Sequence, residues 1–262
     1  MRSLFDARDD GTPLVKICGL QHPQDVEAAV LAGADLVGIV FAPSKRQVTP
    51  AVAKLLVEAA AGAVPVAGVF VDASVEDICA IVRDTGISCV QLSGSAGVSP
   101  ALRTFSDRNT NANHGTRGAL ARDLFATEDA QDPCRPVHPL HVPVIKVIHT
   151  GAERGAPAPL HINTWYPTAT ALLVDSWSLQ GGGSGRVADW EAANALVRAS
   201  CRPVLLAGGL RPDNVIEALR LTGSAGVDVS SGVERNGRKD ADLMQAFVHA
   251  VRQISVYRRK DD

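Results

Sequence analysis

Two residues that could exchange protons with a substrate stand at the ends of short apolar segments. Cys18 ends the segment 14–18 and is followed at once by Gly19, and Asp175 ends the segment 172–175. A cysteine whose pKa is lowered can act as a general base, and a carboxyl group can give or take a proton. The sequence therefore predicts an acid–base site, provided that the fold brings the two segment ends together.

Both residues also have a structural interpretation. A cysteine on a strand is usually a small core hydrophobe, but Cys18 is the last residue of its segment and follows Lys16 by two positions on the same face. A carboxylate is costly to bury in an apolar core, so we expect Asp175 at a rim. Asp72 ends a similar segment, and we expect it only to cap a helix that starts near Ser74.

Three glycine-rich loops follow late apolar segments, at 180–185, 207–210 and 230–233. Each loop alone could be a tight turn. Together they favour a phosphate site, because backbone N–H groups of such loops bind phosphate and glycine lets the backbone approach it closely. The candidate phosphate-binding residues are Gly183, Ser184, Gly208, Gly209, Ser230 and Ser231.

Two charged residues are further candidates for substrate contacts. Arg46 follows the apolar segment 35–41 and could grip a carboxylate through two parallel hydrogen bonds, or could simply be solvated. Asp228 lies inside the segment 225–230 and could contact the substrate or pair with Lys16. Spacing leaves both alternatives open for each residue.

The elements that must position these residues alternate along the chain. We expect strands near 14–18, 35–41, 64–71, 87–92, 143–148, 170–175, 203–207 and 225–230. We expect helices near 23–32, 50–60, 74–84, 99–105, 158–168, 188–198, 212–220 and 240–254. The strands are apolar throughout, as in parallel sheets covered on both faces. Eight such units, with glycine loops after the late strands, favour a (β/α)8 barrel over an open doubly wound sheet.

Single residues support these boundaries. Pro50 and Pro212 stand where first helical turns would begin, and Gly33, Gly86 and Gly223 follow predicted helices as terminating glycines do.

Residues 106–142 interrupt the alternation with a polar sequence rich in Asn, Asp, Pro and His. We expect an extended or partly disordered insertion between the fourth helix and the fifth strand of a single barrel domain spanning 1–262. Its histidines (His114, His138 and His141) have no carboxylate or cysteine at a spacing that would complete a metal site.

Bulk properties limit the functional classes. The 262 residues are 46% hydrophobic and 21% charged, which is typical of soluble globular proteins, and the formal net charge of -2 gives no electrostatic case for binding nucleic acid or an anionic membrane. The most apolar run, 55–71, contains Glu58, Gly62 and Pro65, which argues against a membrane span. Five cysteines without C-x-x-C spacing argue against a disulfide framework or a zinc site and favour the reducing cytoplasm.

In order, these segments resemble the phosphoribosylanthranilate isomerases, (β/α)8 enzymes of tryptophan biosynthesis. The matching segments span nearly the whole chain and are 15–20, 33–35, 38–46, 68–71, 90–92, 173–176, 182–185, 189–190, 206–210, 214–215, 227–234, 237 and 239–240.

The resemblance implies an Amadori rearrangement of N-(5-phosphoribosyl)anthranilate to 1-(o-carboxyphenylamino)-1-deoxyribulose 5-phosphate, an aldose–ketose isomerisation and the third step from chorismate to tryptophan. It makes Asp175 the acid that protonates the ribose ring oxygen and Cys18 the base that removes the C2 proton. It implies that Arg46 binds the anthranilate carboxylate and that the glycine loops bind the phosphate. It also implies that the reaction requires no metal or organic cofactor. The expected partner is a small phosphosugar, and the chain is expected to be a monomer or a homodimer.

Two positions depart from the resemblance, and one of them is Ser184, which keeps the hydroxyl of the threonine that the family commonly has in its glycine loop. Ser93 stands where the family usually has a histidine, which bears on substrate positioning.

Rival functions are also open to a barrel of this kind. Indole-glycerol-phosphate synthase would need a lysine and a glutamate at strand ends, and the imidazole-pathway isomerase uses an aspartate where this chain has Cys18. A phosphosugar-binding barrel without turnover is a further alternative, and the presence of both Cys18 and Asp175 argues against it.

Overall fold

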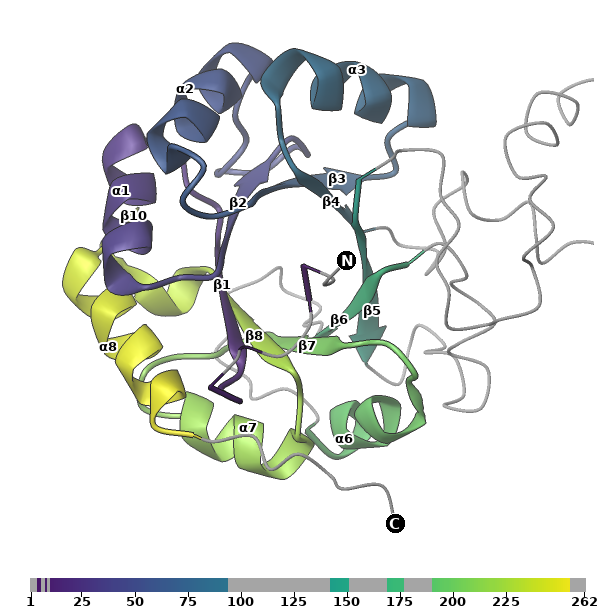
Figure 1. The fold of residues 1–262 in the computed structure, drawn as a ribbon, viewed down its shortest axis with the longest axis vertical. Coiled ribbons are helices and arrows are strands. Elements are labelled where there is room, and N and C mark those ends of the chain that lie inside the picture. The colour runs from purple at the N-terminus through teal and green to yellow at the C-terminus, as the bar shows by residue number, and fades with distance from the viewer. Residues whose placement is uncertain are drawn as a thin grey trace, which may run out of the picture.

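The computed structural model describes residues 4–5, 8, 10–93, 142–150, 169–176 and 190–254. Within them, eight parallel strands close into a barrel in the order β1 to β8, and helices surround it (Figure 1). The strands are β1 (Leu14–Cys18), β2 (Leu36–Val40), β3 (Val66–Val71), β4 (Cys89–Ser93), β5 (Val144–Thr150), β6 (Ala171–Ser176), β7 (Val204–Ala207) and β8 (Gly226–Val229). This confirms the predicted (β/α)8 barrel.

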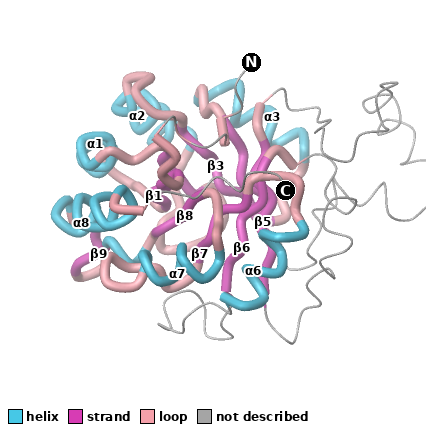
Figure 2. Tube along the Cα trace, turned by 60° about the horizontal axis from the view of Figure 1, so that its bottom comes forward, coloured by secondary structure: helices cyan, strands magenta, loops and turns pink. Residues whose placement is uncertain are grey.

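The described helices form a layer outside the strands (Figure 2). They are α1 (Pro23–Ala32), α2 (Pro50–Ala60), α3 (Val75–Thr85), α6 (Trp190–Ala199), α7 (Val215–Thr222) and α8 (Ala241–Arg252). Helices α1 and α8 lie side by side, so the last helix closes the ring against the first (Figures 1 and 2). A 3-10 turn, η4 (Ser231–Val233), and a small hairpin of β9 (Glu234–Arg235) and β10 (Arg238–Lys239) follow β8.

The predicted elements agree with the structure to within a few residues wherever it can be compared. The helices predicted at 99–105 and 158–168 lie outside the described residues, as do positions 106–141 of the expected insertion. The extent of the single domain stays a prediction. Helix α7 begins at Val215 and not at Pro212, because residues 212–214 form a turn before it.

The ends of the helices follow from local sequence. Pro50 is the first residue of α2, and the Thr49 hydroxyl accepts a hydrogen bond from the Val52 N–H. The predicted terminating glycines of α1, α3 and α7 all take left-handed backbone conformations. The predicted capping role of Asp72 is wrong, because the Ser74 side chain accepts the Asp77 N–H at 3.1 Å.

Alternation along the strands divides the core into two layers. One apolar cluster combines strand and helix residues and fills the space between barrel and helices. A second cluster draws alternate residues from strands β2 to β7 and includes no helix residue, so it fills the barrel interior. Phe5, which is only 1% exposed, belongs to this second cluster. The N-terminal segment therefore contributes to the barrel core.

The same alternation determines which polar residues face the interior. On β1, Val15 and Ile17 belong to the outer cluster, so Lys16 and Cys18 face inward. On β8, Val227 and Val229 are in the outer cluster and Asp228 lies between them. On β6, Leu172 and Val174 are in the outer cluster, and Asp175 continues the inward series of Ala171 and Leu173.

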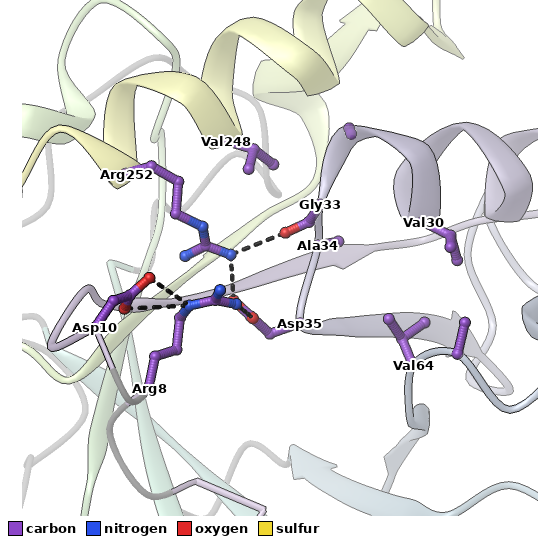
Figure 3. Close-up of a pocket in the computed structure, with 11 residues that line it drawn as sticks. Arg8, Asp10, Val30, Gly33, Ala34, Asp35, Val64, Val248 and Arg252 are labelled. Carbon is purple, nitrogen blue, oxygen red and sulfur yellow. Dashed lines mark hydrogen bonds and ion pairs between the residues drawn. The ribbon is translucent and has the colours of Figure 1, made fainter.

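The amino-terminal end of β2 carries a separate charged cluster (Figure 3). Asp35 accepts hydrogen bonds from the backbone N–H of Val15 at 2.7 Å and from Arg252 of α8 at 2.7 Å, and it also pairs with Arg8. Arg8, Asp35 and Arg252 line a hollow of about 670 Å³ together with Val248 and other residues. This end of a (β/α)8 barrel usually serves stability, and here it ties the N-terminal segment and the last helix to the barrel.

Candidate active site

A buried ion pair inside the barrel joins its first and last strands. Lys16 and Asp228 are register partners on β1 and β8, and Lys16 Nζ lies 2.8 Å from Asp228 Oδ1. The Lys16 side chain is fully buried and that of Asp228 is 10% exposed. Burial alone lowers the pKa of Lys16, but Asp228 and Cys18 raise it above its usual value. Of the two alternatives for Asp228, the structure shows the pairing with Lys16.

A glycine on the neighbouring strand makes room for these side chains. Gly38 of β2 is the register partner of Cys18. A Cβ atom at Gly38 would lie 2.7 Å from Cys18 Sγ and 3.0 Å from Lys16 Nζ. The Cys18 thiol and the Lys16 amine therefore both lie next to the space that a side chain at Gly38 would fill. The sequence did not lead us to predict this role, although a glycine inside an apolar strand is a known sign of close approach.

Cys18 is nearly buried at the carboxyl end of β1, with 7% of its surface exposed. Burial raises the pKa of its thiol, while Lys16 offsets part of that shift and Asp228 adds to it. The condition under which Cys18 would be a ready general base, a lowered pKa, is therefore not met in the free protein. Its nearest cation, Lys16, is nevertheless the group that favours a thiolate.

Asp175 extends from β6 toward the part of the barrel interior that holds Lys16, Cys18 and Asp228. Burial and the negative charge of Asp228 raise its pKa to about 7, and Lys16 offsets part of the shift. A carboxyl group with such a pKa carries a proton that it can donate near neutral pH. The charges of Lys16 and Asp228 shift the pKa values of both Asp175 and Cys18. The fold therefore brings the predicted acid and base to one site.

Arg46 lies against the backbone that follows Cys18. Gly19 has a φ of +78°, and a Cβ there would overlap Arg46 Cδ, so this position requires glycine. The Arg46 guanidinium binds Glu234 through Nε at 2.8 Å and Nη2 at 3.0 Å. Lys239 also binds Glu234, at 3.0 Å. Neither Glu234 nor Lys239 was among the predicted site residues.

The loops after β7 and β8 come into close contact. Gly208 and Gly209 both have positive φ values, of 92° and 64°. A Cβ at Gly232 would overlap the carbonyl oxygen of Leu210, so the two loops pack backbone to backbone. Ser230 and Ser231 lie in the second loop, at the start of η4. The other two predicted phosphate residues, Gly183 and Ser184, lie outside the described residues.

Three other cysteines lie within the described residues, and the charge of Lys16 also acts on one of them, Cys89. Cys79 and Cys89 are free thiols on α3 and β4, and burial raises the pKa of Cys89 to about 12. Cys201 is disulfide-bonded, whereas the number and spacing of the cysteines had argued against a disulfide framework. Across the described part of the chain, no cluster of three or more His, Cys, Asp or Glu side chains could hold a metal ion.

Fold and site together define an enzyme of the (β/α)8-barrel class that works by proton transfer. Comparison with known proteins then identifies the family. The chain matches the family model of N-(5'-phosphoribosyl)anthranilate isomerase over residues 15–113 and 128–250, and it belongs to this family. The predicted enzyme class, an aldose–ketose isomerase of tryptophan biosynthesis, is thereby confirmed.

Relatives match along most of their length. The N-(5'-phosphoribosyl)anthranilate isomerase of Symbiobacterium thermophilum is 36% identical, over 92% of this chain and 99% of the relative. That of Neisseria meningitidis is 35% identical, over 92% and 97%. The crystal structure of phosphoribosyl anthranilate isomerase from Thermotoga maritima has a TM-score of 0.68 at 28% identity, and it covers 92% of this chain and 100% of its own. A structure of such an isomerase in complex with reduced 1-(o-carboxyphenylamino)-1-deoxyribulose 5-phosphate has a TM-score of 0.65 at 27% identity, with the same coverage.

Proposed function

We propose that this chain performs the isomerase reaction of its family with Asp175 as general acid and Cys18 as general base. The observation that carries the proposal is that Cys18 and Asp175 face the barrel interior near the carboxyl ends of β1 and β6, where burial also raises the pKa of Asp175 to about 7. An acid and a base inside one barrel mouth fit a reaction that moves protons and needs no redox step.

The first step opens the ribose ring. The Asp175 carboxyl donates its proton to the ring oxygen, the bond from C1 to that oxygen breaks, and the anthranilate nitrogen forms a double bond to C1. Asp175 is then a carboxylate, and Lys16 favours this charged form. The positive Schiff base and the Lys16 ammonium both favour the thiolate of Cys18 at this stage.

The second step moves the proton from C2. The Cys18 thiolate takes it, and the electrons of that C–H bond form a double bond between C1 and C2 while the nitrogen becomes neutral. The resulting enolamine becomes the ketone when Cys18 gives its proton to C1 and the C2 hydroxyl gives its proton to Asp175, which returns both groups to their starting states. Lys16 is fixed by Asp228 at 2.8 Å, so its charge stays beside Cys18 throughout. Asp228 therefore acts through Lys16 and Asp175 in this proposal, not as a direct substrate contact.

The ends of the substrate would be held by two groups of residues. The loops with Gly208, Gly209, Ser230 and Ser231 would bind the phosphate through backbone N–H groups, together with Gly183 and Ser184. Arg46 would bind the anthranilate carboxylate. Support for this division is that the two loops pack together after β7 and β8, whereas Arg46 follows β2.

The remaining expectations concern partners and location. We keep a small phosphosugar as the partner, a cytoplasmic location, and no binding to nucleic acid. One Thermotoga maritima relative is described as dimeric, and this chain is expected to be a monomer or a homodimer. In the part of the chain that the structure describes, no helix has the length and apolar character needed to cross a membrane.

Fluorescence of N-(5-phosphoribosyl)anthranilate tests the proposal with the wild type, Cys18→Ala and Asp175→Asn. We expect rapid decay with the wild type and rates lower by roughly 10²–10⁴-fold in each variant, the usual contribution of one acid or base. A folded wild type without turnover would indicate a phosphosugar-binding barrel. Persistent turnover in Cys18→Ala would assign the base to another group.

A further inference from the structure

The carboxylate of Glu234 sits between two cations at the edge of the active site. Its Oε1 accepts from Arg46 Nε at 2.8 Å and from Lys239 Nζ at 3.0 Å, and its Oε2 accepts from Arg46 Nη2 at 3.0 Å. Side-chain exposure is 7% for Glu234, 3% for Lys239 and 19% for Arg46. Two cations and one carboxylate leave a single net positive charge at this edge.

A local hairpin places Lys239 opposite Glu234. The two residues are register partners on β9 and β10. The turn between these strands is Asn236-Gly237, with φ values of 54° and 76°, which suits the two-residue turns that join short antiparallel strands. The Asn-Gly pair is the sequence signal that could have revealed this part of the site. The position of the carboxylate is therefore set by the chain segment that directly follows β8.

Glu234 occupies only one edge of the Arg46 guanidinium. A guanidinium has five N–H donors, and Glu234 uses those of Nε and one of Nη2. Within the described residues, Nη1 of Arg46 donates no hydrogen bond. The edge formed by Nη1 and the second N–H of Nη2 is thus available as a fork for another carboxylate.

Lys239 connects this pair to the loop after β8. Besides Glu234, its Nζ lies 2.8 Å from the carbonyl oxygen and 3.4 Å from the hydroxyl of Ser230. Ser230 is one of the residues assigned to the phosphate, and its hydroxyl would be 3.0 Å from a Cβ at Gly19. Arg46 lies against the same Cβ position, so both side chains approach Gly19 on one side. One network therefore lies against the backbone that follows Cys18.

We propose that Glu234 is a positioning residue that holds one edge of Arg46 so that the opposite edge receives the carboxylate of the substrate. Lys239 fixes Glu234 in turn and ties it to Ser230. This inference rests on the proposed function, in which Arg46 binds the anthranilate carboxylate. It predicts that the effect of Glu234 is confined to ligands that carry this carboxylate.

The test compares two ligands by calorimetry. One is reduced 1-(o-carboxyphenylamino)-1-deoxyribulose 5-phosphate, and the other is the same compound without the ring carboxylate. For Glu234→Gln we expect the Kd of the first to rise roughly 10-fold or more, as when a charge-assisted hydrogen bond is weakened, and that of the second to change less than about 3-fold. Steady-state kinetics should show the change mainly in KM.

Three variants complete the design. Arg235→Gln alters the charge of the same hairpin at a side chain that is 61% exposed and should leave both Kd values unchanged. Glu234→Asp, which keeps the charge, should recover part of the carboxylate preference. Arg46→Met should abolish it.

Equal weakening of both ligands by Glu234→Gln, or no change for either, would overturn the inference, and Glu234→Asp allows the same comparison if the glutamine variant does not fold. If Arg46→Met keeps the preference, the proposed role of Arg46 is wrong. If the wild type does not turn over substrate, the proposed function fails independently of the ligand comparison.

Discussion

Lys16 and Asp228, 212 residues apart in the chain, form an ion pair of 2.8 Å inside the barrel, and the lysine has no exposed surface. The pair joins β1 to β8 where the barrel closes. It also supplies the charges that act on Cys18 and Asp175. Stability and chemistry therefore depend on the same two residues.

Removal of Lys16 should be strongly destabilising. In Lys16→Met, Asp228 becomes a nearly buried carboxylate without its partner, and we expect the free energy of unfolding to fall by about 3–5 kcal/mol. Urea denaturation measures this loss. The double variant Lys16→Met, Asp228→Leu should recover much of it, because it removes both charges. A double variant no more stable than the single one would show that the unpaired Asp228 charge is not the cause of the loss.

Asp175 should lower stability at neutral pH. Its pKa in the folded protein, about 7, lies above the ordinary value of 3.8. Between these values the folded state binds more protons than the unfolded state, so the free energy of unfolding falls as the pH rises from about 4 to about 7. Asp175→Asn should raise the free energy of unfolding at pH 8 by on the order of 1–3 kcal/mol, since one pKa unit corresponds to about 1.4 kcal/mol.

The same pKa predicts the alkaline limb of the rate profile. The acid must be protonated, so kcat/KM should fall above a pH of about 7 as Asp175 loses its proton. Stopped-flow fluorescence across pH 5–9 would show this limb. In Asp228→Asn the limb should move to lower pH, because the negative charge that raises the pKa of Asp175 is gone. An unchanged limb in that variant would rule out Asp228 as a cause of the raised pKa.

Gly38→Ala should reduce activity more than stability. The new methyl group would press on Cys18 Sγ at 2.7 Å and on Lys16 Nζ at 3.0 Å and displace both. We expect kcat to fall by about 10²-fold, as expected when a catalytic group is misplaced by around 1 Å. Gly62→Ala is the control: it has a φ of +70° and no atom within 4 Å of the new Cβ, so it should cost stability and leave kcat unchanged.

Asp35→Ala should reduce stability without reducing activity. Asp35 lies at the amino-terminal end of the barrel, where it binds Arg8 and Arg252 (Figure 3). It also accepts a hydrogen bond from the Val15 N–H. Loss of several part-buried charged hydrogen bonds should lower the free energy of unfolding by about 2–4 kcal/mol. The matched control is Asp213→Ala, an exposed partner of Arg211, which should cost less than about 1 kcal/mol. A comparable loss in both variants would show that the cluster has no special role.

The sequence by itself determined the order of the elements, their ends and the candidate acid and base. Local signals sufficed because they act between neighbours: Thr49 and Pro50 start a helix, Gly33 ends one, and continuous apolar runs mark the buried strands. The positions of Cys18 and Asp175 at strand ends followed from the same patterns.

Only the tertiary structure decided how these groups are charged and held. Whether Asp228 pairs with Lys16, and whether Arg46 is solvated or bound to Glu234 188 residues away, depends on which strands become neighbours when the barrel closes. The pKa values of Cys18 and Asp175 depend on burial and on charges from other strands. Such effects act through space, so residue types and spacing along the chain do not determine them.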